Sequence, residues 1–194
     1  MNELVEAEVA NLKFNALRNA LYHTARRKSF ERWNRVFNFT VVLLGAAAIG
    51  DVLRRFGVDQ SLVGVGVALV GAAQLVFDFG RSARDHQALQ RDYYNVLAEI
   101  EECTDPDTEK CALWRSRMTK IAADEPPTLR ALDAKAYNDA LDAMDEIFGY
   151  QSDDRLVVPF SHRVLGGLLY YDGYRYPKIR ELPGYKPRIE APAE

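Results

Sequence analysis

The chain has 194 residues, of which 48% are hydrophobic and 27% are charged, and its formal net charge is −3. Because this charge is slightly acidic, the sequence lacks the global basic field of nucleic-acid-binding proteins, and we expect no direct nucleic-acid binding. Two cysteines and three scattered histidines form neither a disulfide framework nor a metal-spaced motif, so we also expect no metal and no cofactor.

Residues 1–35 are predicted to form a cytoplasmic, amphipathic N-terminal helix. Apolar side chains recur there at helical spacing, and neither proline nor glycine interrupts them. The charge of the segment changes sign along its length, from acidic at the start to basic at the end. Its last ten residues include Arg26, Arg27, Lys28, Arg32 and Arg35.

Residues 36–79 contain two apolar runs, at 36–50 and 61–77, that hold no Lys, Arg, Asp or Glu. With their extensions each reaches about 17 or 18 residues, near the lower end of the ~17–25 that span a bilayer core. A helix that is apolar all round is either deeply buried or in lipid. We therefore predict a transmembrane hairpin with helices at about 36–53 and 61–79. The alternative is a buried helical pair in a soluble bundle.

Basic residues predict the orientation of this hairpin. The flank before the first run holds five of them, the flank after the second run holds three, including Arg81 and Arg84, and the connection 51–60 holds two. By the positive-inside rule, both termini lie in the cytoplasm and the short connection lies outside. A solvated helix face is the alternative for the 26–35 cluster.

Residues 80–150 are predicted to form a cytoplasmic helical region. The helix of the second run continues to residue 102, and an Asp-Pro-Asp turn within 103–108 ends it. A short helix follows over about 109–123. The sequence 124–128 then breaks the chain before another helix at 129–148. The expected fold class is thus all-α, a membrane protein whose two-helix hairpin extends into a cytoplasmic helical bundle.

Residues 151–194 are predicted to hold an amphipathic helix and a Tyr/Pro-rich tail. The apolar segment 157–171 is too short and too interrupted to span a membrane. It either lies in the headgroup plane or closes the cytoplasmic bundle, and the sequence leaves both open. The end of the chain, 170–194, is expected to be extended and only partly ordered.

A stripe of small and polar residues marks one side of the second apolar run. At helical spacing it consists of Ser61, Gly64, Ala68, Gly71, Gln74 and Asp78. Small residues let helices approach closely in lipid, and a buried amide or carboxylate avoids the lipid tails. One interpretation is that the stripe packs against the first helix or a neighbouring subunit. The other is that several hairpins assemble and turn it toward an aqueous path, since one hairpin cannot enclose a channel.

No sequence motif of catalysis accompanies these features. The chain lacks a GxSxG nucleophile motif, a phosphate-binding Gly-rich loop with lysine, and an HExxH metal motif. We therefore expect that the protein is not an enzyme.

Several segments resemble the SLATT proteins, two-helix membrane effectors of bacterial conflict systems. The resemblance covers most of the chain and rests on residues 17–23, Arg26 and Arg27, residues 74–79, Tyr93 and Tyr94, and residues 124–128 with 131–138. It implies a homo-oligomeric, pore-forming or membrane-perturbing effector of antiphage defence. Such an effector causes growth arrest or cell death, that is, abortive infection. It also implies activation by a separate sensor or signalling protein, or by a nucleotide signal.

A second hypothesis belongs to another functional class. The chain would then be a non-conducting membrane anchor, a scaffold that holds a partner signalling enzyme through its cytoplasmic helices or its tyrosine-rich end.

Overall fold

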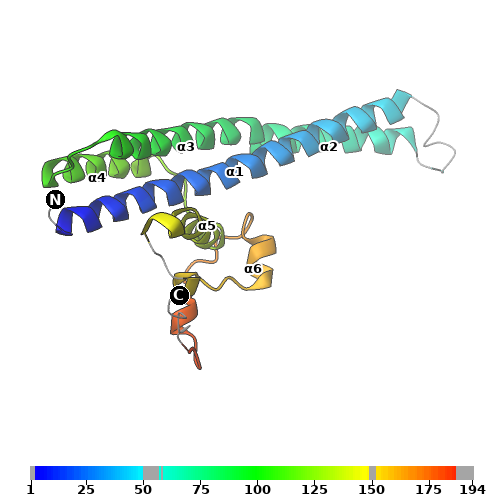
Figure 1. The fold of residues 1–194 in the computed structure, drawn as a ribbon. Helices are drawn as coiled ribbons and strands as arrows, with labels where there is room; N and C mark the ends of the chain where they lie inside the picture. The colour runs from blue at the N-terminus through cyan, green and yellow to red at the C-terminus, as the bar shows by residue number, and fades with distance from the viewer. Residues whose placement is uncertain (1–2, 50–56, 58, 149–151, 187–194) are drawn as a thin grey trace. The chain divides into compact units, whose positions relative to one another are not determined.

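The computed structural model describes residues 3–49, 57, 59–148 and 152–186. Over these residues the protein is all-helical, as the sequence predicts. Its helices are α1 (Glu3–Ile49), α2 (Gln60–Phe77), α3 (Phe79–Glu102), α4 (Thr108–Ala123), α5 (Arg130–Phe148) and α6 (Phe160–Leu165). Two short 3₁₀ helices, η2 (Ser152–Asp154) and η3 (Ile179–Glu181), complete them (Figure 1).

Two compact units divide the chain. The bundle unit comprises Met1–Ala25 and Ala88–Glu194, and the helix-pair unit comprises Arg26–Gln87. Helices α1 and α3 each begin in one unit and end in the other. The 47-residue α1 carries the amphipathic N-terminal segment without a break into the first apolar run. The predicted end of that run at residue 53 lies outside the described residues.

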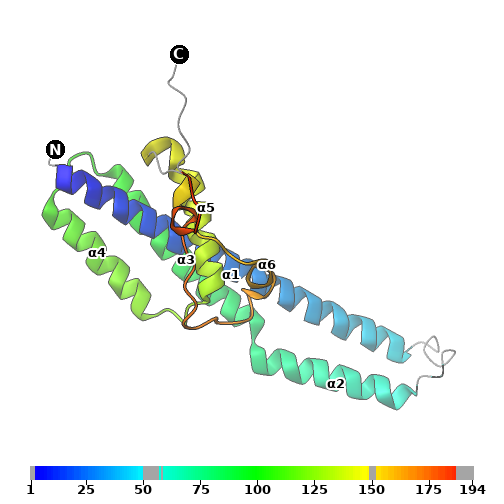
Figure 2. The same ribbon diagram turned by 90° about the horizontal axis from the view of Figure 1, so that it is seen from below.

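The bundle unit packs around the N-terminal half of α1. One buried cluster joins α1 to α3 and α4, and two others join α1 to α5 and to the residue before it. α5 crosses α1 in this unit (Figure 2). The clusters consist of Leu12, Val96, Ile100, Cys111 and Trp114; of Phe14, Ala140, Leu141 and Met144; and of Tyr22, Leu129 and Ala136.

The helix breaks in the bundle unit follow from their residues. Asp107 caps α4 by accepting a hydrogen bond from the Lys110 amide at 2.7 Å, which satisfies a free N–H of the first turn. Consecutive prolines at 126 and 127 disfavour helix before α5. Pro159 precedes α6 as its N-cap. The predicted breaks at 103–108 and 124–128 are confirmed.

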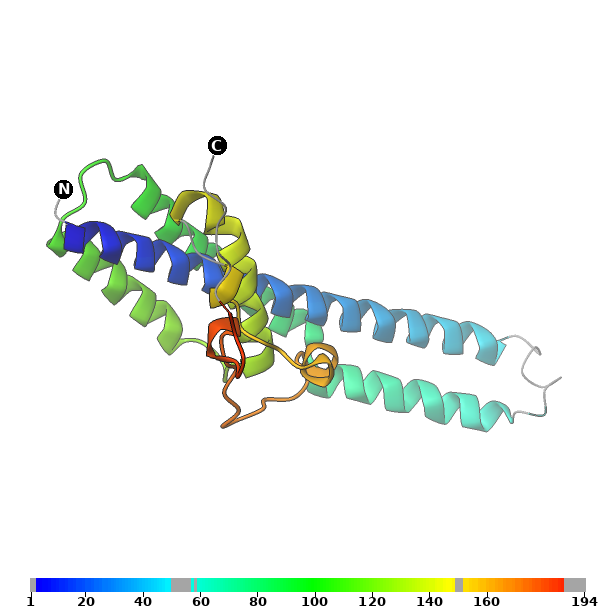
Figure 3. The ribbon, with the colours of Figure 1, turned by 60° about the horizontal axis from the view of Figure 1, so that its bottom comes forward.

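The helix-pair unit places the apolar half of α1 beside α2 (Figure 3). Aromatic rings link the base of the pair, with Phe37 5.0 Å from Phe79 and Phe30 stacked 5.5 Å from the buried His86. In the described part of the chain, one helical stretch, within Ser61–Glu102, is long and apolar enough to cross a membrane by length and composition. Only 6% of the apolar 18-residue segment within this stretch is buried in the structure.

The structure differs from the predictions at two places in the chain. The second apolar run does not continue straight into α3, because Asp78 takes a left-handed conformation (φ 35°) and separates α2 from α3. The end of the chain, expected to be extended over 170–194, is instead folded back around His162 within residues 170–186. This ring stacks on Tyr171 at 3.8 Å, and its Nδ1 lies 2.8 Å from the Tyr176 hydroxyl. Residues 187–194 lie outside the described range.

Candidate functional site

The predicted stripe on α2 divides between two sides of the helix. Gly64 and Ala68 are exposed, and a Cβ added at Gly64 or Gly71 would meet no atom within 4 Å. The side that faces α1 is a neighbouring one, marked by the buried Val63 and by Gly66, whose added Cβ would lie 3.7 Å from Leu44 Cδ1. The small residues of the stripe therefore do not pack against α1 within this chain.

Gln74 stands apart from these small residues because its side chain reaches α1. Its Nε2 donates a hydrogen bond to Oδ1 of Asn38 at 2.6 Å. Two amides thus meet between the mostly apolar stretches of the pair, and a hydrogen bond stabilises polar groups in such surroundings. Gln74 links the two helices of the pair.

Asn38 was not among the residues predicted for this site, although the sequence contains a signal for it. In an antiparallel pair, residues equally distant from the connection lie opposite each other. Asn38 and Gln74 are each 18 residues from residue 56, near the middle of the connection 51–60. The contact of Leu44 with Gly66 follows nearly the same register.

The two ends of the stripe, Ser61 and Asp78, take part in helix caps. Oδ1 of Asp59 accepts hydrogen bonds from the Ser61 amide and hydroxyl, at 2.9 and 2.8 Å, and this N-cap lowers the pKa of Asp59. Asp78 closes α2 by donating its amide to Gln74 O at 3.1 Å. Its carboxylate begins α3 by accepting from the Arg81 amide at 3.0 Å. Ser61 and Asp78 therefore have structural partners at both ends of α2.

The predicted orienting residues lie around the base of the helix pair. Lys28, Arg32 and Arg84 are exposed, as are Arg35 and Arg81. Glu31 lies 3.5 Å from Arg27 and 3.7 Å from Arg35, and Arg26 covers the Phe30 ring at 4.5 Å. On α3, Arg81 lies 3.9 Å from Asp85. Exposed ion pairs of this kind contribute little to stability.

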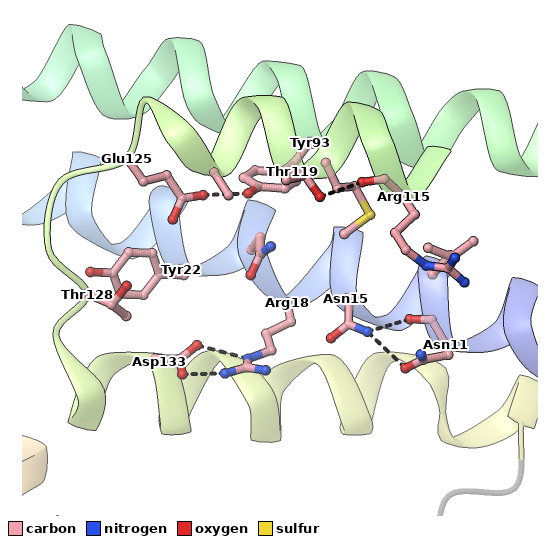
Figure 4. A pocket seen from close by; sticks show the side chains of 14 residues that line it. Asn11, Asn15, Arg18, Tyr22, Tyr93, Arg115, Thr119, Glu125, Thr128 and Asp133 are labelled. Carbon is pink, nitrogen blue, oxygen red and sulfur yellow. Dashed lines mark hydrogen bonds and ion pairs between the residues drawn. The ribbon is translucent and has the colours of Figure 1, made fainter. Parts of the chain in front are cut away.

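A polar pocket in the bundle unit was not foreseen from the sequence. It has a volume of about 400 Å³ and is bounded by α1, α3, α4 and α5 with the α4–α5 connection (Figure 4). Cavities of this size hold small molecules. Its polar lining residues are Asn11, Asn15, Arg18, Asn19, Tyr22, Tyr93, Arg115, Thr119, Glu125, Thr128 and Asp133.

A buried network forms one wall of this pocket. The Tyr93 hydroxyl donates to Oε1 of Glu125 at 2.5 Å, and Nε2 of His23 lies 3.1 Å from the same oxygen. Both rings are fully buried and stack on each other. Burial raises the pKa of Tyr93, and the hydrogen bond to Glu125 raises it further, so the phenol stays protonated as a donor. The network ties α1 and α3 to the α4–α5 connection.

The two arginines that line the pocket are paired with carboxylates. Arg18 forms a two-pronged ion pair with Asp133, and Arg115 pairs with Glu8. Apart from Glu125, the other polar groups of the lining are uncharged, and they include asparagine amides at every fourth position of α1 and threonine hydroxyls. The spacing of the asparagines in the sequence was the available signal. Their place in the pocket lining depends on the surrounding helices, which the sequence does not place.

No group of His, Cys, Asp and Glu suited to a metal ion occurs among the described residues. Comparisons with family models, curated proteins and solved structures find no match to this chain.

Proposed function

We propose that the protein is a membrane effector of bacterial antiphage defence, in which the apolar half of α1 and α2 cross the inner membrane as a hairpin. Copies assemble and open a pore or perturb the bilayer, and the cell stops growing or dies. A separate sensor protein or a nucleotide signal activates the assembly. In this proposal the chain itself catalyses no reaction. The resemblance to SLATT proteins supports it.

The outward direction of the apolar side chains carries the membrane part of the proposal. Both helices of the pair expose large hydrophobic residues, and contiguous exposed apolar surfaces of this kind mark contacts with lipid or protein. Removing such a side chain from water contributes about 1.5–3 kcal/mol. The exposed residues are Val36, Phe39, Val42 and Leu43 on α1 and Leu62, Val65, Leu69, Leu75, Val76 and Phe77 on α2.

Charge supports the orientation in which both termini are cytoplasmic. Exposed basic side chains lie at the same end of the helix pair on both of its arms, before Val36 on α1 and after Asp78 on α3. Cytoplasmic flanks of membrane helices carry such an excess. Trp33, which is 40% exposed, lies in the same region, where indole rings favour the headgroup level.

The open side of α2 supports the assembly part. Gly64 and Ala68 are exposed, a Cβ added at Gly64 would meet no described atom within 4 Å, and small residues of this kind permit close helix approach in lipid. We place the contact between copies on this side. Asn38 and Gln74, in contrast, hydrogen-bond to each other within one chain.

Membrane depolarisation tests the proposal directly. The chain is expressed in bacteria with a potential-sensitive dye, and then reconstituted in dye-loaded vesicles. We expect loss of potential and release of dye, and we expect Gly71→Leu to abolish both because it fills the open side of α2. Val65→Leu, on an exposed position, is the matched control. An intact potential under full activation by the partner would refute the proposal.

Conductance also separates the proposal from the anchoring alternative. A scaffold would leave both the potential and the vesicles intact, and it would co-purify strongly with its partner enzyme. If Gly71→Leu and Gln74→Leu both leave toxicity unchanged, the stripe has a packing role only.

A further inference from the structure

An apolar surface on the bundle unit has no partner among the described residues. Phe160, Val164 and Leu168 recur every four residues along α6 and the turn after it, and they are 81%, 63% and 59% exposed. Leu165, Leu169 and Tyr170 extend this surface. We call these six residues the α6 patch. Exposed clusters of large apolar side chains mark interaction surfaces.

The fold holds the α6 patch outward. The opposite side of this segment rests on α5, where Gly166 is buried so closely that an added Cβ would lie 2.8 Å from the Ala131 Cβ. The amide of Arg130 donates to Tyr170 O at 3.3 Å. Because these contacts fix the inner side of the segment, the patch cannot turn inward without leaving α5.

A histidine-centred cluster secures the chain that follows the patch. His162 stacks on Tyr171, lies edge-on to Tyr174 at 4.5 Å, and contacts the Tyr176 hydroxyl through Nδ1. The segment is thus a closed loop with its own internal packing. This packing holds the backbone that carries the α6 patch.

The rim of the patch has the composition of a membrane-interface surface. Arg163 is exposed between Phe160 and Val164, Tyr170 within the patch is partly exposed, and so is Tyr174, which packs on His162 in the chain that follows. Arginine reaches lipid phosphates, tyrosine favours the headgroup level, and leucine and phenylalanine enter the acyl boundary.

We propose that the α6 patch inserts into the surface of the bilayer that holds the hairpin, as a second, peripheral membrane contact. This inference rests on the proposed function. Since patch and hairpin belong to one chain, the bilayer is always at a high effective concentration, and a shallow apolar surface suffices for binding. The basic and aromatic rim fits lipid headgroups better than a self-complementary face on a second copy.

Site-directed fluorescence tests the proposal on the full chain in vesicles of phosphatidylethanolamine and phosphatidylglycerol. In a Cys103→Ser background, an NBD dye is attached after Leu168→Cys, Leu113→Cys or Val65→Cys. Leu113, on α4, is 64% exposed and isolated, so it matches Leu168 in exposure and controls for the affinity of the dye for lipid. Doxyl-labelled lipid quenches dyes in the bilayer, and iodide quenches dyes in water.

We expect doxyl lipid, and not iodide, to quench the dye at position 168, and we expect the reverse at position 113. Quenching by iodide at position 168, equal to that at 113, overturns the inference. Protection from both quenchers also overturns it, because it indicates a second copy on the patch. The dye at position 65 reports the hairpin: doxyl quenching there together with iodide quenching at 168 refutes only the patch, and iodide quenching at 65 refutes the proposed function itself.

Discussion

Replacing Tyr93 by phenylalanine tests the buried network that joins α1, α3 and the α4–α5 connection. The substitution removes the hydroxyl that donates to Glu125 and leaves the ring, which is fully buried and stacked on His23. A hydrogen bond to a charged partner contributes about 1.5–3 kcal/mol. We expect the free energy of unfolding of the bundle unit to fall by ~1.5–3 kcal/mol.

Urea unfolding in mild detergent measures this change. In a Trp33→Phe background, the fluorescence of the buried Trp114 reports the bundle unit. Tyr94→Phe is the matched control, because Tyr94 is 38% exposed, and its substitution is expected to stay within about 0.5 kcal/mol. A double-mutant cycle with Glu125→Gln then isolates the Tyr93–Glu125 coupling.

The dependence of stability on pH provides a second readout of the same contact. The pKa of Tyr93 is raised in the folded state, so its contribution is complete below the unfolded value of about 10 and is lost as the pH rises above it. The wild type should therefore lose stability above about pH 10 more steeply than Tyr93→Phe. Equal stabilities for Tyr93→Phe and Tyr94→Phe, with no coupling and parallel alkaline profiles, would refute the assigned role.

Three further predictions concern single positions. Asp78→Ala should destabilise the start of α3 by about 0.5–2 kcal/mol through loss of its cap, whereas Asp78→Asn should preserve it; faster hydrogen exchange at the following amides in the alanine variant alone is the readout. Gly166→Ala should cost about 1–3 kcal/mol in thermal unfolding because no space is left for a methyl group, and Gly64→Ala, in open space, should leave stability unchanged. Burial raises the pKa of the Cys111 thiol, so iodoacetamide at neutral pH should modify the half-buried Cys103 first, and equal labelling rates would contradict the packing of α4.

The helices of the bundle unit were predictable because local residues determine where they end. The Asp-Pro-Asp turn and the paired prolines each act within a few residues. The break between α2 and α3 at Asp78 was not predicted because the apolar run continues past it to Phe79. A left-handed residue other than glycine does not interrupt the periodic pattern from which helices are predicted.

A candidate site could be predicted from the sequence only where all of its residues lie on one helix. The six-residue stripe follows from the periodicity of α2. Which side of α2 faces α1 depends on how the two helices pack, and in the structure Val63 and Gln74 lie on that side. The pocket depends on four helices at once, so Asn15 and His23 remained ordinary members of an amphipathic segment. The contacts of His162 were hidden for the same reason, since its tyrosine partners follow it across a loop.

The contact between Asn38 and Gln74 also bears on how the protein reaches the membrane. A ribosome delivers Asn38 first, and in lipid an asparagine amide without a partner opposes the insertion of a short apolar segment. Only when α2 arrives does Gln74 supply the partner. If the pair spans a membrane as proposed, we expect this contact to favour insertion of the two segments together over insertion of the first segment alone.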